Sequence, residues 1–289
     1  MRRLVPCIVS LLVLAACVEE AEPQSTSTSP STAPATTSTS TGTTEAPTTT
    51  VTEGACPAGD VMFADGGLAD FDPPSSDSTR IAGINWRTSG VCQLFTISFA
   101  TEDGAPATTP PALSARLLRG AGVLRVETAA TSSVVADQLV EAGAVERLFV
   151  PVAEDGTRFV DLVLAEPVVA RARLQTSPAR VEIELQPGGP EEIGHPLMAG
   201  GVVVVEPGSA AVAVPVLDLA GYSTGEAASY DVTITRSGQP LVETELQTLD
   251  SPGSWSAFHL VIQVGADTYD TLQVTDEDGS VVAAIPFSR

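Results

Sequence analysis

The stretch Val91-Cys92-Gln93-Leu94-Phe95-Thr96-Ile97-Ser98-Phe99 decides the fold. Successive side chains of an extended chain point to opposite sides, so Val91, Gln93, Phe95, Ile97 and Phe99 share one face. That face is mostly apolar, whereas the opposite face holds Cys92, Leu94, Thr96 and Ser98. The alternation predicts a strand with one face in a core and the other face toward solvent.

Similar runs lie on both sides of this strand, and turn residues separate them. In the first half we expect strands at residues 80–86, 91–100, 123–128, 145–152, 158–164 and 180–185. In the second half we expect strands at residues 202–205, 211–219, 229–236, 241–248, 258–264, 268–275 and 281–287. Asp155-Gly156, Ser237-Gly238, Pro252-Gly253 and Asp278-Gly279 are the turn signals between them. Together with 24 Gly and 22 Pro, this pattern predicts an all-β chain.

Residues 131–143 favour a short helix instead. The hydroxyl side chains at 131–133 can cap its first turn, and Val135 and Leu139 lie one turn apart on one face. Gly143 can end the helix in a left-handed conformation.

A Gly- and Pro-rich segment divides the β region. Gln186-Pro187-Gly188-Gly189-Pro190-Glu191-Glu192-Ile193-Gly194 cannot continue a strand or a helix. It predicts a boundary between one β domain at residues 55–189 and a second at residues 195–289. About seven short runs in the second domain are typical of an immunoglobulin-like sandwich.

The first β domain carries a family resemblance. Parts of this domain resemble AMIN-type domains of bacterial envelope proteins: Arg147-Leu148-Phe149-Val150, the run at 158–164 and the closing Ser177-Pro178-Ala179-Arg180-Val181-Glu182-Ile183-Glu184-Leu185. In that family a final proline–arginine–strand pattern closes a small β-sandwich. The resemblance implies a non-catalytic, AMIN-like domain that localises proteins in the envelope, in some members by binding peptidoglycan.

The second β domain carries another family resemblance. Short segments of this domain follow one another in a characteristic order: Val203-Val204-Val205-Glu206-Pro207, Val214-Pro215-Val216, Leu219-Ala220-Gly221-Tyr222, Gly253-Ser254-Trp255-Ser256-Ala257-Phe258, Asp278-Gly279-Ser280 and Ile285-Pro286-Phe287. This series resembles the immunoglobulin-like domain of bacterial spore-germination and related surface lipoproteins. It implies an adhesive or scaffolding module.

The N-terminus is typical of an export signal. Arg2-Arg3 precedes an apolar run at residues 4–16, whose helix would span only about 20 Å and is short for a membrane. Leu14-Ala15-Ala16-Cys17 resembles the bacterial lipobox. The resemblance implies that residues 1–16 are a lipoprotein signal peptide and that Cys17 is acylated. The alternative is an ordinary cleavage site that happens to precede a cysteine.

Residues 17–54 are expected to form a disordered stalk. Between residues 25 and 52, 28 positions hold 13 Thr, 6 Ser and 3 Pro, so there is little apolar surface to bury. Such a tract suits either an O-glycosylated stalk or a bare linker.

Two cysteines remain for the folded part, because Cys7 leaves with the signal peptide and Cys17 is lipidated. An exported domain with two cysteines favours a disulfide, here between Cys56 and Cys92. A zinc site is the rival interpretation, but no His lies near either thiol.

Charge excludes nucleic acid as a partner. The chain has 36 acidic and 14 basic residues, for a net charge of −22, and every basic residue is Arg. Residues 55–190 hold 10 of the Arg, against two in residues 191–289. If either domain contacts an anionic envelope polymer, we expect it to be the first.

One motif could indicate catalysis. Gly221-Tyr222-Ser223-Thr224-Gly225 fits the G-x-S-x-G pattern of serine hydrolases, which requires a strand that turns sharply into a helix. The flanks favour strand and loop, and the only His residues are His195 in the linker and His259 in an expected strand. We therefore expect a Gly/Ser turn at Ser223 and a solvent-facing His259.

Two acidic clusters have side chains that could bind a cation. Asp276-Glu277-Asp278-Gly279 lacks the length of an EF-hand loop, so a charged hairpin turn is favoured. A second cluster flanks Pro73-Pro74 and contains Asp60, Asp65, Asp70, Asp72 and Asp77. We expect solvated acids there and no metal ion.

The sequence thus predicts two β-sandwich domains, AMIN-like and then immunoglobulin-like, outside the cytoplasm and anchored to the cell membrane through lipidated Cys17. The expected function is non-catalytic binding or scaffolding, with peptidoglycan, another cell-wall polymer or an envelope protein as the partner, and with no cofactor. One alternative is capture of a small molecule in a pocket, for which Trp86 and Trp255 are the residues to watch. The other is an envelope hydrolase that uses Ser223.

Overall fold

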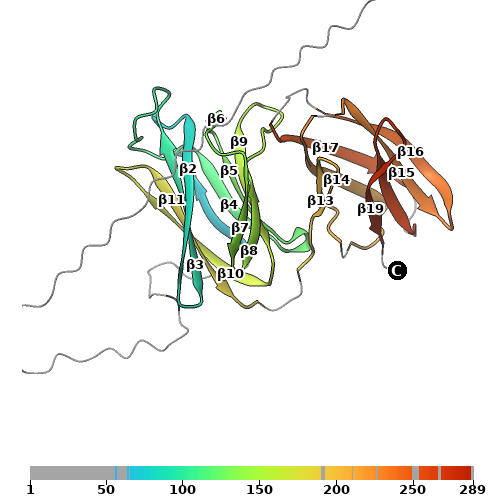
Figure 1. Cartoon of the computed structure of the whole chain (residues 1–289), viewed down its shortest axis with the longest axis horizontal. Coiled ribbons are helices and arrows are strands. Elements are labelled where there is room, and N and C mark those ends of the chain that lie inside the picture. The colour runs from blue at the N-terminus through green and yellow to red at the C-terminus, as the bar shows by residue number, and fades with distance from the viewer. Residues whose placement is uncertain are drawn as a thin grey trace, which may run out of the picture. The chain divides into compact units, whose positions relative to one another are not determined.

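The strand-forming runs pair into four sheets. The structure is a computed structural model that describes residues 56, 64, 66–189, 193–209, 211–225, 227–248, 254–265 and 268–287. The described residues all fall in one compact unit. Figure 1 shows the labelled strands. The residues expected to form a signal peptide and a stalk, together with Cys17, Asp60 and Asp65, lie outside the described residues.

Two sheets form the N-terminal sandwich. The first has six antiparallel strands in the order β1 (Gly67–Phe71), β4 (Leu113–Leu118), β5 (Val123–Thr128), β9 (Arg158–Leu164), β8 (Val145–Phe149) and β7 (Asp137–Ala142). The second has the order β10 (Val168–Gln175), β11 (Arg180–Pro187), β3 (Cys92–Ala100), β2 (Arg80–Ser89) and β6 (Ser132–Ser133). Only its β2–β6 pair is parallel. A 3₁₀ turn, η1 (Arg119–Ala121), links β4 to β5.

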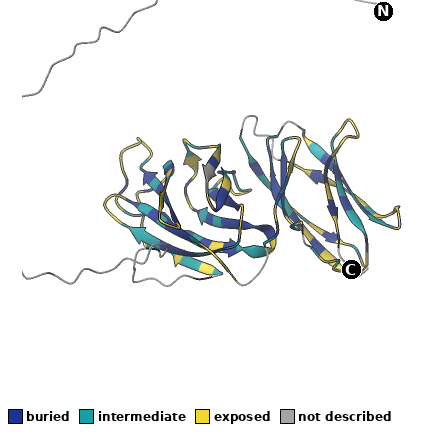
Figure 2. Cartoon of the chain, turned by 60° about the horizontal axis from the view of Figure 1, so that its bottom comes forward, coloured by how far each residue is buried: buried dark blue, intermediate teal, exposed yellow. Residues whose placement is uncertain are grey.

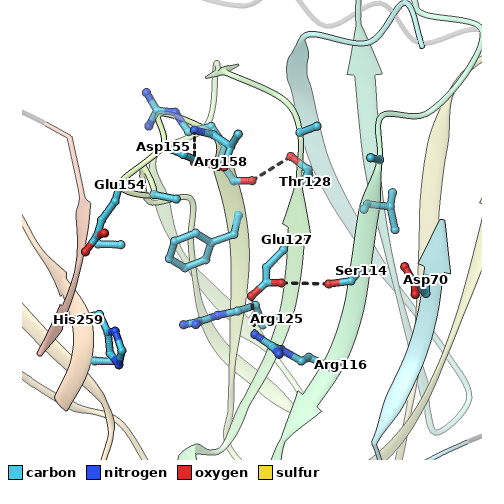
Figure 3. Close-up of a pocket in the computed structure, with 18 of the residues that line it drawn as sticks. Asp70, Ser114, Arg116, Arg125, Glu127, Thr128, Glu154, Asp155, Arg158 and His259 are labelled. Carbon is cyan, nitrogen blue, oxygen red and sulfur yellow. Dashed lines mark hydrogen bonds and ion pairs between the residues drawn. The ribbon is translucent and has the colours of Figure 1, made fainter. Parts of the chain in front are cut away.

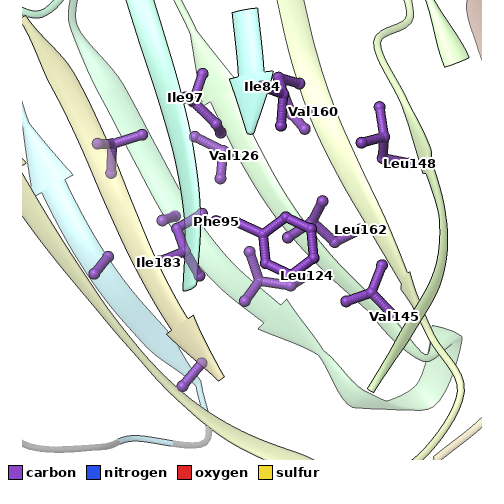
Figure 4. Packing of buried hydrophobic residues seen from close by; sticks show 14 of the residues in the cluster. Ile84, Phe95, Ile97, Leu124, Val126, Val145, Leu148, Val160, Leu162 and Ile183 are labelled. Atoms are coloured by element: carbon purple, nitrogen blue, oxygen red, sulfur yellow. The ribbon is translucent and has the colours of Figure 1, made fainter. Parts of the chain in front are cut away.

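The core of this sandwich confirms the alternation in β3. Gln93, Phe95, Ile97 and Phe99 are all at most 3% exposed, whereas Val91 precedes the strand and is 41% exposed. Figure 4 shows the Phe95 ring among buried residues of both sheets. On the six-stranded sheet, Leu124, Val126, Val160 and Leu162 face this core.

The helix expected at residues 131–143 is wrong. This segment forms the short strand β6 and the strand β7, which pairs with β8. Val140 is buried and Leu139 is 67% exposed, so the burial does not follow the Val135–Leu139 spacing. Gly143 does adopt a left-handed conformation, with φ of 64°, but in the turn between β7 and β8.

Two further antiparallel sheets form the C-terminal sandwich. One has the order β12 (Leu197–Ala199), β13 (Val202–Glu206), β14 (Val216–Ser223) and β17 (Ser256–Gln263). The other has the order β16 (Gln239–Gln247), β15 (Ser229–Arg236), β18 (Thr271–Thr275) and β19 (Val281–Pro286). A second core, which includes Leu219, Ile234 and Phe258, lies between them.

Figure 2 shows that the buried positions run along the strands of both sandwiches, with many exposed positions in the turns. The structure therefore confirms the all-β fold of packed antiparallel sheets. No helix in the described part of the chain is long and apolar enough to cross a membrane.

Candidate functional site: a groove between the two sandwiches

A third apolar cluster joins the two sandwiches. Its buried members are Ala121, Val123, Phe149, Phe159, Val163, Val203, Val205 and Tyr222. Phe149 of β8 makes two aromatic contacts across the junction, because its ring centroid lies 4.9 Å from that of Tyr222 and 5.0 Å from that of Trp255. Tyr222 and Trp255 belong to the C-terminal sandwich, so these contacts connect the two.

Backbone contacts reinforce this junction. The Val152 N–H donates to the Trp255 carbonyl at 2.8 Å, and the Ala257 N–H donates to the Val152 carbonyl at 2.7 Å. At Gly208 a Cβ atom would lie 1.9 Å from the carbonyl oxygen of Gly120, so the two backbones approach as closely as glycine allows. A change in the angle between the sandwiches would have to break these contacts.

Beside the junction lies a groove with a volume of about 920 Å³. Strand alternation exposes one face of the six-stranded sheet here: the even positions Leu124 and Val126 of β5 enter the core, and Arg125 and Glu127 point outward. Figure 3 shows the labelled polar side chains of the groove, which come from β1 (Asp70), β4 (Ser114, Arg116), β5 (Arg125, Glu127), the loop before β9 (Glu154, Asp155) and β17 (His259).

A buried ion pair lies next to the groove. Arg125 donates from Nε to Oδ1 of Asp161 at 2.8 Å and from its terminal nitrogen to Oδ2 at 2.7 Å. Asp161 is 0% exposed, and its burial raises the pKa of the carboxyl, although Arg125 opposes that shift. Burial alone would lower the pKa of the Arg125 guanidinium, but the contact with Asp161 raises it above its ordinary value. Arg125 also lies 4.6 Å from the centroid of the Phe159 ring, so its charge is already held.

A second pair occupies the floor. Arg116 of β4 pairs with Glu127 of β5, and Glu127 also accepts a hydrogen bond from the Ser114 hydroxyl. Both members of the ion pair are nearly half exposed. The cations at Arg116 and Arg125 are therefore each matched by a carboxylate.

Arg158 differs from Arg116 and Arg125. It is half-buried at the groove wall, and no carboxylate of the described residues lies within ion-pair distance of its guanidinium. Burial lowers the pKa of Arg158, and its buried Nε has no hydrogen-bond partner. The Thr128 hydroxyl fixes the backbone here by donating to the Arg158 carbonyl at 2.9 Å. Arg158 thus presents a positive group without a matching acid.

Exposed carboxylates surround the rest of the groove. Asp70, Asp72, Glu154 and Glu206 line it and have no ion-pair partner among the residues that the structure describes. Asp155 accepts hydrogen bonds from the N–H and the hydroxyl of Thr157, and these lower its pKa. The unmatched acids therefore outnumber the one unmatched arginine.

The turn expected at Ser223 is wrong, because Gly221, Tyr222 and Ser223 continue strand β14. Ser223 is the last residue of β14, is 0% exposed, and is followed by β15 instead of a helix. It pairs across the sheet with Ser256. His259 pairs with Ala220 on the same two strands, and its ring is 55% exposed and 3.5 Å from Asp218. As expected, His259 faces solvent, and His195 lies in the segment between the sandwiches.

The expected disulfide joins Cys56 to Cys92, with the two Cα atoms 5.5 Å apart. Glu184 is the third potential metal ligand close to these sulfurs. However, Arg171 holds the Glu184 carboxylate, with Nε at 2.7 Å from its Oε2. The disulfide therefore ties Cys56, the first residue that the structure describes, to Cys92 in β3.

The two tryptophans divide between structural roles. Trp86 of β2 stacks on Phe95 at 6.1 Å and packs against the N-terminal core. Trp255 packs in the junction. Neither one lines the groove, whose aromatic residues are Phe71, Phe159 and Phe258.

The acidic clusters have local roles in the described region. Asp77 accepts hydrogen bonds from the backbone N–H groups of Thr109 and Thr108, which lower its pKa. Asp276 accepts from the N–H groups of Asp278 and Ser280 in the turn between β18 and β19, as expected for a charged hairpin. Asp70 and Asp72, by contrast, line the groove.

Sequence reasoning missed the groove. Its floor forms only when β4 pairs with β5 and β5 with β9, and its acids come from segments more than 130 residues apart, such as Asp70 and Glu206. The available signal was the alternating charge along β5, at Arg125 and Glu127, on the face opposite the core. No protein family model, curated protein or solved structure matches this chain.

Proposed function

We propose that this chain is a lipid-anchored binding protein of the cell envelope, which captures an envelope component in the groove between its two sandwiches without changing it chemically. Cys17 would hold the protein at the membrane, and the Ser/Thr-rich stalk would lift the folded part away from it. The partner class is a cell-wall polymer, peptidoglycan included, or an envelope protein.

The groove is the observation that carries this proposal. Ligand sites are concave and combine apolar lining with a few convergent polar groups, and their volumes are about 300–1,000 Å³. The groove has a volume of about 920 Å³, aromatic lining at Phe71 and Phe258, and an unmatched arginine. Its two sides come from different sandwiches, so the junction sets its width.

The same observation favours capture over hydrolysis by Ser223. The Ser223 hydroxyl is buried and does not line the groove. Its register partner across the sheet is Ser256, the first residue of β17. A hydrolase would need a base at that hydroxyl, and His259 lies on β17 opposite Ala220 instead.

A retention assay tests the proposal. Full-length protein in detergent is mixed with purified cell wall at low and moderate salt, and the bound fraction is compared with that of Ala220→Trp. Ala220 lines the groove on β14, so a tryptophan there should fill it and reduce retention. The matched control is Val216→Trp, because Val216 lies on the same strand, is 45% exposed and is outside the groove.

Equal retention of both variants would contradict a role for the groove, and absence of retention would contradict a cell-wall partner. Cys17→Ser tests the anchor separately: a radiolabelled fatty acid should be incorporated into the wild-type protein and not into the variant. Absence of the label from the wild type, or its presence in the variant, would contradict lipidation at Cys17.

A further inference from the structure

The unmatched charges of the groove have both signs, and they lie in one cavity. Arg158 provides a guanidinium without an acidic partner, and Glu154, Glu206, Asp70 and Asp72 provide carboxylates without a basic partner among the described residues. The other charges are already satisfied, because Arg125 is held by Asp161 and Arg116 by Glu127. A ligand with only one kind of charge would leave one set unused.

We propose that the groove binds a short peptide with a free ammonium group and a free carboxylate, with Arg158 holding the carboxylate and the surrounding acids holding the ammonium group. This inference rests on the proposed function and names the ligand class of the same groove.

Arginine suits the carboxylate end. A guanidinium can donate two parallel N–H bonds to one carboxylate, and such charge-assisted bonds are among the strongest in proteins. Arg158 is half-buried, so its interaction with a ligand is screened less than that of an exposed arginine.

The acidic wall suits the ammonium end. Four unmatched carboxylates in one cleft focus a negative potential, and the net charge of −22 strengthens it at long range. A purely anionic polymer would be repelled by this wall. The chain's own stalk is also a poor occupant, because residues 17–54 contain five acids and no basic residue.

The rest of the lining suits a peptide backbone. Small side chains leave room for the main chain of a ligand: Ala112, Ala129, Ala153, Ala220 and Ala257. The Ser114 and Thr157 hydroxyls donate to Glu127 and Asp155, so toward a ligand they can act only as acceptors for peptide N–H groups. Phe71 and Phe258 add apolar contact for the side chains of the ligand.

Calorimetric titration of the full-length protein in detergent tests this inference with three probes: trialanine, N-acetyl-trialanine and trialanine amide. Each capped probe lacks one charge, and losing a charge-assisted contact should weaken binding about tenfold or more. Trialanine should therefore bind at least tenfold more tightly than either capped probe, and its affinity should fall as salt rises.

Two variants assign the ends. Arg158→Gln should remove the preference for trialanine over its amide and keep the preference over the acetylated probe. The double variant Glu154→Gln/Glu206→Gln should do the opposite. Arg87→Gln on β2 and Glu243→Gln/Glu245→Gln on β16 are the matched controls, because these side chains are exposed and outside the groove, and they should bind as the wild type does.

Equal affinity for all three probes, or no binding of trialanine, would overturn the inference. If the protein is nevertheless retained on cell wall and Ala220→Trp is not, the proposed function stands and only the ligand class falls. If trialanine binds as expected but the protein is not retained on cell wall, the ligand class stands and the cell-wall partner is wrong.

Discussion

Replacing Phe149 by Ala should separate the two sandwiches. Phe149 is 0% exposed and its ring contacts Tyr222 and Trp255, both on the other side of the junction. The side chain points away from the N-terminal core and into the cluster that joins the sandwiches. Its loss should therefore weaken the junction more than either core.

The expected magnitude follows from these contacts. Removing a fully buried phenylalanine costs about 3–5 kcal/mol in the free energy of unfolding. Each aromatic pair contributes about 0.5–1.5 kcal/mol beyond its buried area, so the pairs with Tyr222 and Trp255 together account for about 1–3 kcal/mol. That share acts between the sandwiches, since both partners lie in the C-terminal one.

Urea unfolding with tryptophan fluorescence measures the effect, because the chain has only two tryptophans. Trp86 reports on the N-terminal core and Trp255 on the junction, and Trp86→Phe or Trp255→Phe isolates each signal. In the parent protein both signals should share one midpoint. In Phe149→Ala, the midpoint from Trp255 should fall below that from Trp86.

The control is Phe99→Ala, which removes a side chain that is 2% exposed and belongs to the N-terminal core. It should lower the free energy of unfolding without opening the junction first. The reasoning is refuted if Phe149→Ala costs less than about 1 kcal/mol, the size of an average substitution, or if its two midpoints stay equal.

Three further predictions concern single residues. Tyr222→Phe should raise the free energy of unfolding by about 1 kcal/mol in urea titrations, because the buried hydroxyl has no hydrogen-bond partner among the described residues; a loss of similar size would mean that the hydroxyl is satisfied. Asp77 has its pKa lowered below the ordinary 3.8 by the N–H groups of Thr109 and Thr108, so its stabilisation is present above pH 3.8 and lost as pH falls through the lowered value. Amide exchange at Thr109 should speed up in that acid range, and should be fast at every pH in Asp77→Ala; unchanged exchange in the variant would contradict this role. Cys92→Ala should lower the free energy of unfolding by about 2–4 kcal/mol under non-reducing conditions, and no loss would show that the disulfide does not form in solution.

The alternating strands could be predicted because one face of each is buried. The limits expected for residues 123–128, 158–164 and 229–236 agree with β5, β9 and β15. The strand expected at residues 211–219 is displaced and forms as β14, Val216–Ser223. Strands β1, β4, β10 and β12 were missed. In β1 and β4 small residues such as Ala69 and Ala115 interrupt the contrast between the two faces.

The helix at residues 131–143 failed for a different reason. Two apolar side chains four residues apart fit a helix, but the same spacing also fits a strand, since both positions then share a face. Pairing with β8 decided the outcome. The stability of such a pairing depends on the packing of the whole sheet, which the sequence of residues 131–143 alone does not show. Strand pairing also created the groove, where Arg125 meets Asp161 from 36 residues away.

The concentration of arginine in the first domain has a structural explanation. Arg116, Arg125, Arg147, Arg171, Arg173 and Arg180 each lie within 4 Å of a carboxylate. Most of this positive charge therefore pairs within the fold. A count of arginines in the sequence cannot separate such pairs from a free cationic surface, because the pairs form across strands.

Hydrogen–deuterium exchange on the full-length protein, with and without solubilised cell-wall fragments, shows whether the groove binds an envelope component. We expect slower exchange in the segments that border the groove, β4, residues 153–157 and β17, and unchanged exchange in β15 and β16 on the opposite sheet. Protection confined to β15 and β16, or no protection at all, would contradict a binding groove between the sandwiches.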